Sequence, residues 1–177
     1  MTMVATDEIE DVGDAMRSGR PVRGHGPYKV MIAQDGLDFQ AAVLDDPVPT
    51  GAQLLDLAGA RPALDFQVYQ LLRNGVMESL RPDETVDLRS AGSERFVVFR
   101  TDRSFRFELD GQVQEWGAAA ISGAVLKRLA GVDPATYGVW LEVRGADDRR
   151  ITDNDLVNLA EPGVERFFTG IVQTTEG

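Results

Sequence analysis

Few side chains in this 177-residue chain could perform chemistry. There is no cysteine, which excludes disulfides, cysteine-ligated zinc and thiol catalysis. The one histidine, His25, lies in Gly24-His25-Gly26, a flexible context that indicates a linker residue rather than a ligand or a general base. No nucleophile–histidine–acid set can be assembled, and no Gly-Lys-Ser/Thr loop is present to cradle a phosphate. The sequence predicts a protein that is not an enzyme and needs no cofactor.

Two acidic stretches, Asp147-Asp148 and Asp153-Asn154-Asp155, raise the question of calcium binding. They lack the spaced oxygen ligands and the glycine of an EF-hand loop. Carboxylates at such places commonly accept hydrogen bonds from nearby backbone N–H groups. We therefore interpret both stretches as turn and helix caps, and predict no metal site.

Composition excludes further classes of function. The net charge is −11, from 29 acidic and 18 basic residues, which repels phosphate backbones and predicts no nucleic-acid partner. Hydrophobic residues make up 43% of the chain, as in soluble globular proteins. No apolar run approaches the ~18 residues of a membrane helix, and the N-terminus has no signal-peptide pattern. We expect a cytoplasmic protein that does not associate with membranes.

The chain repeats its own sequence at a spacing of about seventy residues, so each expected helix and strand occurs twice. Gly163-Val164-Glu165-Arg166-Phe167 matches Gly92-Ser93-Glu94-Arg95-Phe96. Further upstream, residues 122–131 match residues 50–59, and Asp110-Gly111 pairs with Asp35-Gly36. The sequence thus predicts two copies of one small unit.

Each copy predicts the same order of elements: hairpin, helix, strand, short strand, strand. Asp110-Gly111 and Asp35-Gly36 are strong signals for two-residue hairpin turns. Ser122 and Thr50 stand at helix N-cap positions, and Gly131 and Gly59 follow the apolar stripe where a left-handed residue ends a helix. The later strands are expected at residues 137–143 and 164–172 in the second copy, and at 66–72 and 94–100 in the first.

These patterns predict an α+β protein of two tandem domains, each a mixed sheet packed on one helix. The boundaries are a flexible leader over residues 1–27, a first domain over 28–101, a second over 102–172 and a tail over 173–177. Five Gly or Pro residues between Arg17 and Pro27 support the leader.

The order of elements resembles the β-grasp arrangement of ubiquitin. The resemblance can be made more specific than ubiquitin-like folds in general. Three stretches together resemble the bacterial multiubiquitin family: Gly163–Phe168, Tyr137–Val143 and Ser122–Ala124. The resemblance covers residue 28 to about residue 170. It implies a protein modifier that works with an E1-like adenylating enzyme, an E2-like conjugating enzyme and a metal-dependent deubiquitinase-like peptidase. The family also suggests a role in phage defence or stress.

A ubiquitin-like modifier is activated at its C-terminal carboxylate, so the resemblance implies Gly177 as the conjugation point. A terminal residue without a side chain lets nucleophiles approach the carbonyl. The chain departs from ubiquitin, which ends in two glycines, because the acidic Glu176 precedes Gly177. Gly170 is a second candidate end, although it is expected within the last strand.

The resemblance also implies an apolar recognition face on the third strand of each copy, with Val68, Tyr69, Trp140 and Leu141 as candidate docking residues. Because side chains alternate along a strand, one of each neighbouring pair points inward and the other outward. The repeated pairs Glu165-Arg166 and Glu94-Arg95 are interpreted as cross-strand charge pairs on a solvated face, which contribute little.

Two other functions remain open from the sequence. In the first, the two units form a non-covalent adaptor, or associate with themselves through exposed strand edges. In the second, the chain is a sulfur carrier ending in a thiocarboxylate, although such carriers usually have one unit. The target protein and its acceptor residue are not encoded in any recognisable pattern.

Overall fold

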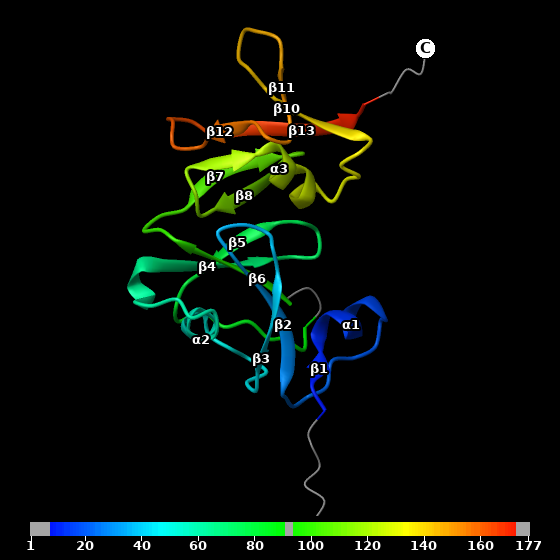
Figure 1. The fold of residues 1–177 in the computed structure, drawn as a ribbon, viewed down its shortest axis with the longest axis vertical. Coiled ribbons are helices and arrows are strands. Elements are labelled where there is room, and N and C mark those ends of the chain that lie inside the picture. Colours follow the sequence, from blue (N-terminus) through cyan, green and yellow to red (C-terminus); the bar gives the residue numbers. More distant parts are fainter. Residues whose placement is uncertain (1–7, 91–93, 173–177) are drawn as a thin grey trace, which may run out of the picture. The chain divides into compact units, whose positions relative to one another are not determined.

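The computed structural model describes residues 8–90 and 94–172, and its contacts divide the chain into two compact units. Figure 1 shows the order of the elements along the chain. Within the described residues, no helix is both long and apolar enough to cross a membrane.

The first unit is a mixed sheet with one helix across its core face. Its strands are ordered β3-β2-β6-β4-β5, and β2 and β6 run parallel. The core joins the sheet, through Val30, Val68 and Phe96, to Leu54 and Leu55 of the helix α2. The elements are β2 (Tyr28–Gln34), β3 (Gln40–Leu44), α2 (Gly51–Leu57), the 3₁₀ turn η1 (Ala63–Asp65), β4 (Phe66–Leu71), β5 (Met77–Leu80) and β6 (Arg95–Arg100).

The second unit repeats this plan. Its sheet has the order β11-β10-β13-β7-β8, with β7 and β13 parallel, and Phe107 packs edge-on against Phe167 in its core. A separate two-stranded ladder joins β12 to β9. The elements are β7 (Phe105–Leu109), β8 (Gln112–Trp116), β9 (Ala120–Ser122), α3 (Gly123–Ala130), β10 (Tyr137–Leu141), β11 (Arg149–Ile151), β12 (Leu156–Asn158) and β13 (Glu165–Ile171).

Both predicted helices begin where the capping pattern places them. Ser122 accepts a hydrogen bond from the Val125 N–H at 3.2 Å, and Thr50 forms a reciprocal capping box with Gln53. Gly131 ends α3 in the left-handed conformation, with φ of 67°. The capping interpretation is also confirmed for Asp155, which accepts from the Thr152 N–H at 2.8 Å.

The hairpins differ between the repeats. In the second unit Leu109 pairs with Gln112, so Asp110 and Gly111 form the predicted two-residue turn with φ of 50° and 81°. In the first unit the pairing stops at Ile32 and Gln40, and β3 starts at Gln40. The prediction of a tight Asp35-Gly36 turn was therefore wrong: Asp35 has a positive φ of 57°, but it lies inside a longer loop.

The predicted leader is also different in the structure. Residues Glu10–Asp11 form β1, which pairs in parallel with the start of β2, and Val12–Arg17 form the helix α1. Val12 and Ala15 are fully buried, and Val12 belongs to the core of the first unit. The apolar positions Val12, Ala15 and Met16 have helical spacing, so residues 10–17 belong to the first domain rather than to a leader.

An ion pair fastens this N-terminal segment. The Glu10 carboxylate is buried and accepts from both Arg20 Nη atoms at 3.1 and 2.5 Å, and from the Arg23 N–H at 2.9 Å. The hydrogen bonds from Arg20 hold the pKa of Glu10 below its ordinary value, against the opposing effect of burial.

The contacts divide the described chain between residues 102 and 103, and they group residues 74–78, which include the start of β5, with the second unit.

We expect Gly123→Ala to destabilise the second unit by about 1–3 kcal/mol, as overpacking does. A Cβ at this first helical position would lie 2.1 Å from the Thr152 carbonyl oxygen. Helix propensity alone would predict the opposite sign, because alanine favours a helix over glycine. Urea unfolding followed by tryptophan fluorescence measures this unit, since both tryptophans, Trp116 and Trp140, belong to it. An unchanged midpoint would contradict the close approach of the Thr152 carbonyl.

We expect Glu10→Gln to loosen the segment from β1 to α1 by about 1–3 kcal/mol at pH 7, because the charged acceptor of Arg20 is lost. The folded pKa is lowered, so the carboxylate stabilises the fold above the ordinary glutamate pKa of about 4.3. This advantage is lost as the pH falls through the lower folded value. Hydrogen exchange of residues 10–17 should therefore differ between wild type and variant at pH 7, and the difference should shrink as the pH falls below the ordinary glutamate value. A difference that does not shrink with falling pH would contradict the assignment to charge.

Candidate functional site

An exposed aromatic cluster lies on the outer side of the second sheet. Trp140 of β10 and Phe168 of β13 are directly opposite in the antiparallel register, so their side chains share one side of the sheet. Their rings stack with centroids 5.8 Å apart and planes 11° from parallel. The Arg150 guanidinium of β11 lies 5.7 Å from the centre of the Trp140 ring. We call Trp140, Phe168 and Arg150 the aromatic face.

Two glycines give the aromatic face its floor. Gly138 and Gly170 are also paired in register. Each lies two residues from Trp140 or Phe168 along its strand, and therefore on the same side of the sheet. A Cβ on Gly138 would lie 2.9 Å from the Trp140 ring, and one on Gly170 would lie 3.3 Å from it. The indole therefore lies over the glycine pair instead of projecting into solvent, which leaves a flat surface.

The exposure of the face separates it from the core. Phe168 is 38% exposed and Trp140 is half-buried, whereas their neighbours Val139 and Phe167 point inward and are buried. Arg166 continues the outward row of β13 and pairs across strands with Glu108 at 3.4 Å. The cross-strand interpretation of Arg166 is thus confirmed; Arg95, its counterpart, lies over the Phe39 ring at 5.9 Å.

The structure separates the four predicted docking residues. Trp140 lies on the aromatic face. Val68 and Leu141 are buried inward at 1% and 8% exposure, as alternation allowed for one residue of each pair. Tyr69 follows Val68 in the strand and does not belong to the core cluster that contains Val68, as alternation predicts for neighbouring residues; its ring packs edge-on against Phe99 at 5.6 Å, and its hydroxyl donates to Gln67. Val68 and Leu141 are therefore core residues rather than docking residues.

Phe168 was missed in the sequence, although a signal for it existed. The last strand was predicted, and antiparallel pairing with the third strand places one of its alternate residues beside Trp140. Glycine inside both strands, at 138 and 170, was a second signal, because a strand glycine often marks the close approach of another group.

The end of β13 is held on both sides. The Asp110 carboxylate at the hairpin turn accepts from the Thr169 N–H and hydroxyl, each at 2.8 Å. The Val172 N–H donates to the Thr136 carbonyl at 2.7 Å. Gly170 lies within β13, as expected. Gly177, the predicted conjugation point, lies outside the described residues.

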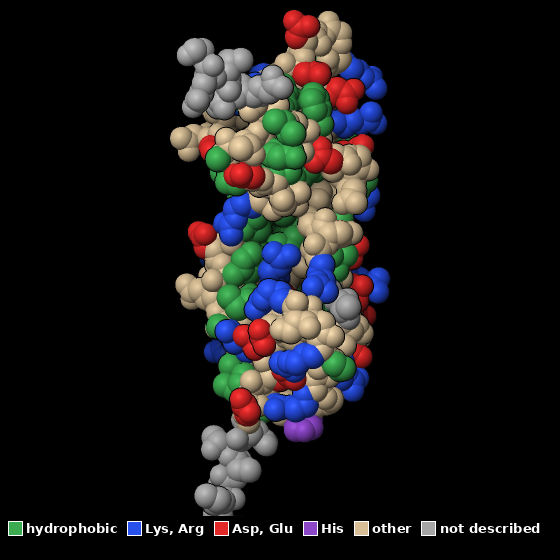
Figure 2. All heavy atoms as spheres, turned by 90° about the vertical axis from the view of Figure 1, so that its right-hand side faces the viewer, with side chains coloured by type: hydrophobic (Ala, Val, Ile, Leu, Met, Phe, Trp, Pro, Cys, Tyr) green, Lys and Arg blue, Asp and Glu red, His purple; other side chains and the backbone are tan. Residues whose placement is uncertain are grey.

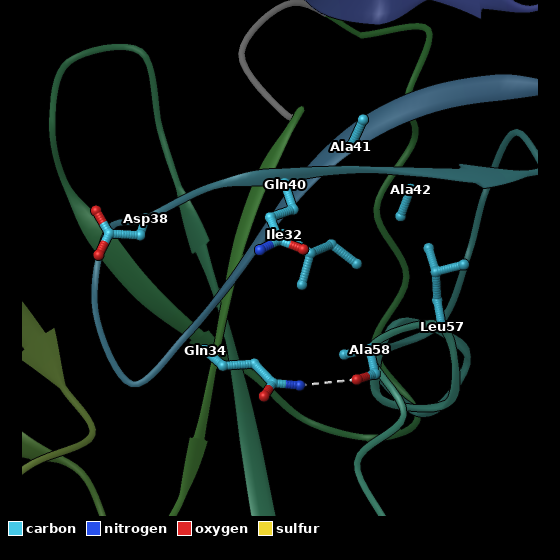
Figure 3. A pocket seen from close by; sticks show the side chains of 8 residues that line it. All are labelled: Ile32, Gln34, Asp38, Gln40, Ala41, Ala42, Leu57 and Ala58. Carbon is cyan, nitrogen blue, oxygen red and sulfur yellow. Dashed lines mark hydrogen bonds between the residues drawn. The ribbon is translucent and has the colours of Figure 1, made fainter.

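A groove in the first unit is a second candidate site. It runs between β3 and the end of α2, with Ile32, Ala42, Leu57 and Ala58 among its lining residues (Figure 3). The Gln34 side chain spans it and donates to the Ala58 carbonyl at 2.8 Å. In the described part of the chain, β3 pairs with β2 alone, so its other edge is a place where an extended segment can add.

Acidic residues surround this groove. Asp38 lines the groove itself, and Asp45, Asp46 and Asp56 line a second hollow that shares Leu57 with it. Asp46 accepts from the Val48 N–H, which lowers the pKa of its carboxyl. Arg61 lies 3.4 Å from Asp56 and offsets part of the negative charge. The groove therefore suits a basic partner better than an acidic one.

His25 is exposed on the first unit, where it is the one purple side chain of Figure 2. Its Nδ1 lies 3.2 Å from the Gly26 carbonyl oxygen. That contact fits the interpretation of His25 as a linker residue.

We expect Phe168→Ala to shift tryptophan emission to longer wavelength and to destabilise the second unit by about 0.5–1.5 kcal/mol, the range of aromatic pairs. Trp140 loses its stacked neighbour, whereas Trp116 is buried and donates to the Ala120 carbonyl, so its emission stays constant. Ile171→Ala, at a strand position that is 68% exposed, is the matched control and should change neither property. Identical spectra for the Phe168 variant and wild type would contradict the stack.

The comparisons with known proteins agree with this geometry. Comparison with curated proteins finds no relative that matches the chain. The family model of multiubiquitin matches twice, over residues 36–101 and 105–170, and both matches fall on the two repeated sheet-and-helix units. The chain belongs to the multiubiquitin family, and consists of two tandem β-grasp-like α+β domains.

Proposed function

We propose that this chain is a protein modifier, joined to a target through the carboxylate of Gly177 after adenylation by an E1-like enzyme. The observation that carries the proposal is the place of β13. It is the last strand, it is paired on both sides within its sheet, and it leads directly toward the tail. A segment that leaves a rigid central strand can be threaded into an activating enzyme without disturbing the domain.

The chemistry needs only the carboxyl end of the chain. The carboxylate attacks ATP to form an acyl-adenylate and pyrophosphate, and an enzyme thiol then displaces AMP to form a thioester. A target amine attacks that carbonyl, so an amide forms and the thiol leaves. Glycine at the reacting position removes steric hindrance. Glu176 adds a negative charge nearby, which an activating enzyme must neutralise with a basic group.

The aromatic face supplies a docking surface for such enzymes. Trp140 and Phe168 are large, partly exposed and held in place by the glycine pair and by Arg150. Preorganised aromatic residues make good interface anchors, because few rotamers are lost on binding. Since Phe168 lies on β13, a partner bound there is close to the strand that leads to the tail. E2-like enzymes and deubiquitinase-like peptidases are partners of the kind proposed.

The second candidate function is a non-covalent adaptor, which the groove beside β3 favours. An extended segment can pair with the β3 edge and place apolar side chains between β3 and α2. Asp45 and Asp46 would attract basic residues in that segment. This function needs no activated carboxylate, and the two candidates are therefore separable by experiment.

The test uses the full chain with an E1-like enzyme from the same genome, ATP and magnesium, analysed by non-reducing gels and intact mass spectrometry. We expect a thiol-sensitive adduct with wild type and none after deletion of Gly177. Glu176→Gln, the matched control, keeps the glycine and should form the adenylate at least as fast. Trp140→Ala should leave the adenylate intact and weaken transfer to a second enzyme. The absence of any adenylate or adduct with an enzyme shown to be active would reject the modifier and favour the adaptor.

A further inference from the structure

The basic residues of this chain are very unequal in their chemistry. Of 18 basic residues, only Lys29 and Lys127 are lysines, and all the others are arginines. An arginine guanidinium stays protonated and does not act as an amine nucleophile at ordinary pH. Two side-chain amines are therefore the complete set at which this chain could itself accept an acyl group to form an isopeptide bond.

Lys127 is a structural residue. It lies on α3 with a side chain only 10% exposed, and its Nζ donates to Asp153 Oδ1 at 2.7 Å and to the Pro134 carbonyl at 3.2 Å. The matching position of the first repeat is Leu55, which is 2% exposed. To react, the Lys127 amine would have to break its contacts with Asp153 and the Pro134 carbonyl and move out of a nearly buried position. Both partners would then lose the charged group that they bind, which is unfavourable.

Lys29 has the opposite surroundings. It lies on β2 with a side chain 39% exposed, and its Nζ lies 3.2 Å from Asp11 Oδ2, whose side chain is also 36% exposed. Asp11 and Val43 are its partners in register on the two neighbouring strands, and Val43 is 46% exposed. An exposed pair of this kind is held weakly and exchanges with water. The Lys29 amine can therefore reach a reagent without any change in the core.

We propose that Lys29 is the one side chain of this protein that accepts the C-terminal carboxyl group of another copy, so that self-attachment is restricted to a single linkage. This inference rests on the proposed function, because an enzyme-bound thioester of the first copy must supply the acyl group. The neutral Lys29 amine attacks the thioester carbonyl. A C–N bond forms, the C–S bond breaks, and the amine proton passes to the departing thiolate.

The number of acceptors sets the form of the product. Each copy carries one carboxyl donor and one exposed side-chain amine, so copies that join through Lys29 form linear chains without branches. Lys29 contacts the N-terminal segment through Asp11, its ion-pair partner. Asp11 also caps α1, because it accepts a hydrogen bond from the Asp14 N–H at 3.0 Å. The linkage is therefore placed where β1, β2 and β3 lie side by side in the first unit.

The test compares wild type, Lys29→Arg and Lys127→Arg in the reconstituted conjugation reaction. Lys29→Arg keeps a positive charge opposite Asp11. We expect wild type to form dimers and longer species linked at Lys29 by peptide mapping, and Lys29→Arg to form the thioester but no self-conjugate. Lys127→Arg should behave as wild type, with tryptophan fluorescence confirming its fold. A linkage at Lys127 or at the N-terminal amine, or a thioester without any self-conjugate, would overturn the inference while leaving the modifier function intact. No thioester at all would reject both.

A second measurement on the full-length protein needs no enzyme. Acetylation by an N-hydroxysuccinimide ester, followed over time by mass spectrometry, reports the reactivity of each amine. We expect Lys29 to react at least about tenfold faster than Lys127, because only Lys127 must leave a nearly buried ion pair. Equal rates, or faster reaction at Lys127, would overturn the assignment, whatever the outcome with the E1-like enzyme.

Discussion

The parallel pairing of the last strand with the first is the constraint on which each unit depends. In the second unit β13 lies between β7 and β10, and in the first unit β6 lies between β2 and β4. A strand in this position joins two strands that are distant in the sequence, and so ties the beginning of the unit to its end. The chain end of the second unit is consequently bound by main-chain hydrogen bonds up to Val172, and the residues that follow begin from a fixed point.

This central strand also creates the aromatic face. Because β13 pairs antiparallel with β10, the alternating positions of both strands coincide, so that Trp140 meets Phe168 and Gly138 meets Gly170. The glycine pair allows the indole to lie flat, and the flat indole allows the phenyl ring to stack. A side chain at either glycine would push the ring away from the sheet. The same pairing that holds the chain end thus determines the surface next to it.

Local signals were sufficient for much of this fold. Caps at Ser122 and Thr50 and the Asp110-Gly111 turn depend on residues within a few positions of each other, so the sequence alone indicated them. The longer first hairpin was not predictable from Asp35-Gly36, because the same Asp-Gly pair forms a two-residue turn in the second unit and lies inside a longer loop in the first. Residues 7–16 were compatible with one or two helical turns, but the Gly- and Pro-rich stretch that follows placed them in the predicted leader, although Val12, Ala15 and Met16 have helical spacing.

The two repeats have kept one fold while their surfaces have diverged. At the third strand, Tyr69 in the first unit packs edge-on against Phe99, whereas Trp140 in the second stacks face to face on Phe168. At the first strand, the first unit gains β1 and α1, which place Asp11 beside Lys29. The fold determines where each position lies on the sheet, but it does not determine which side chain an exposed position carries. After duplication, the surface residues of one repeat can therefore be substituted without altering the surface of the other. The second repeat carries the open face and the strand that leads to the chain end, and the first carries the exposed amine. A single-unit modifier would have to place all three features on one small sheet, where a partner bound to one would obstruct the others.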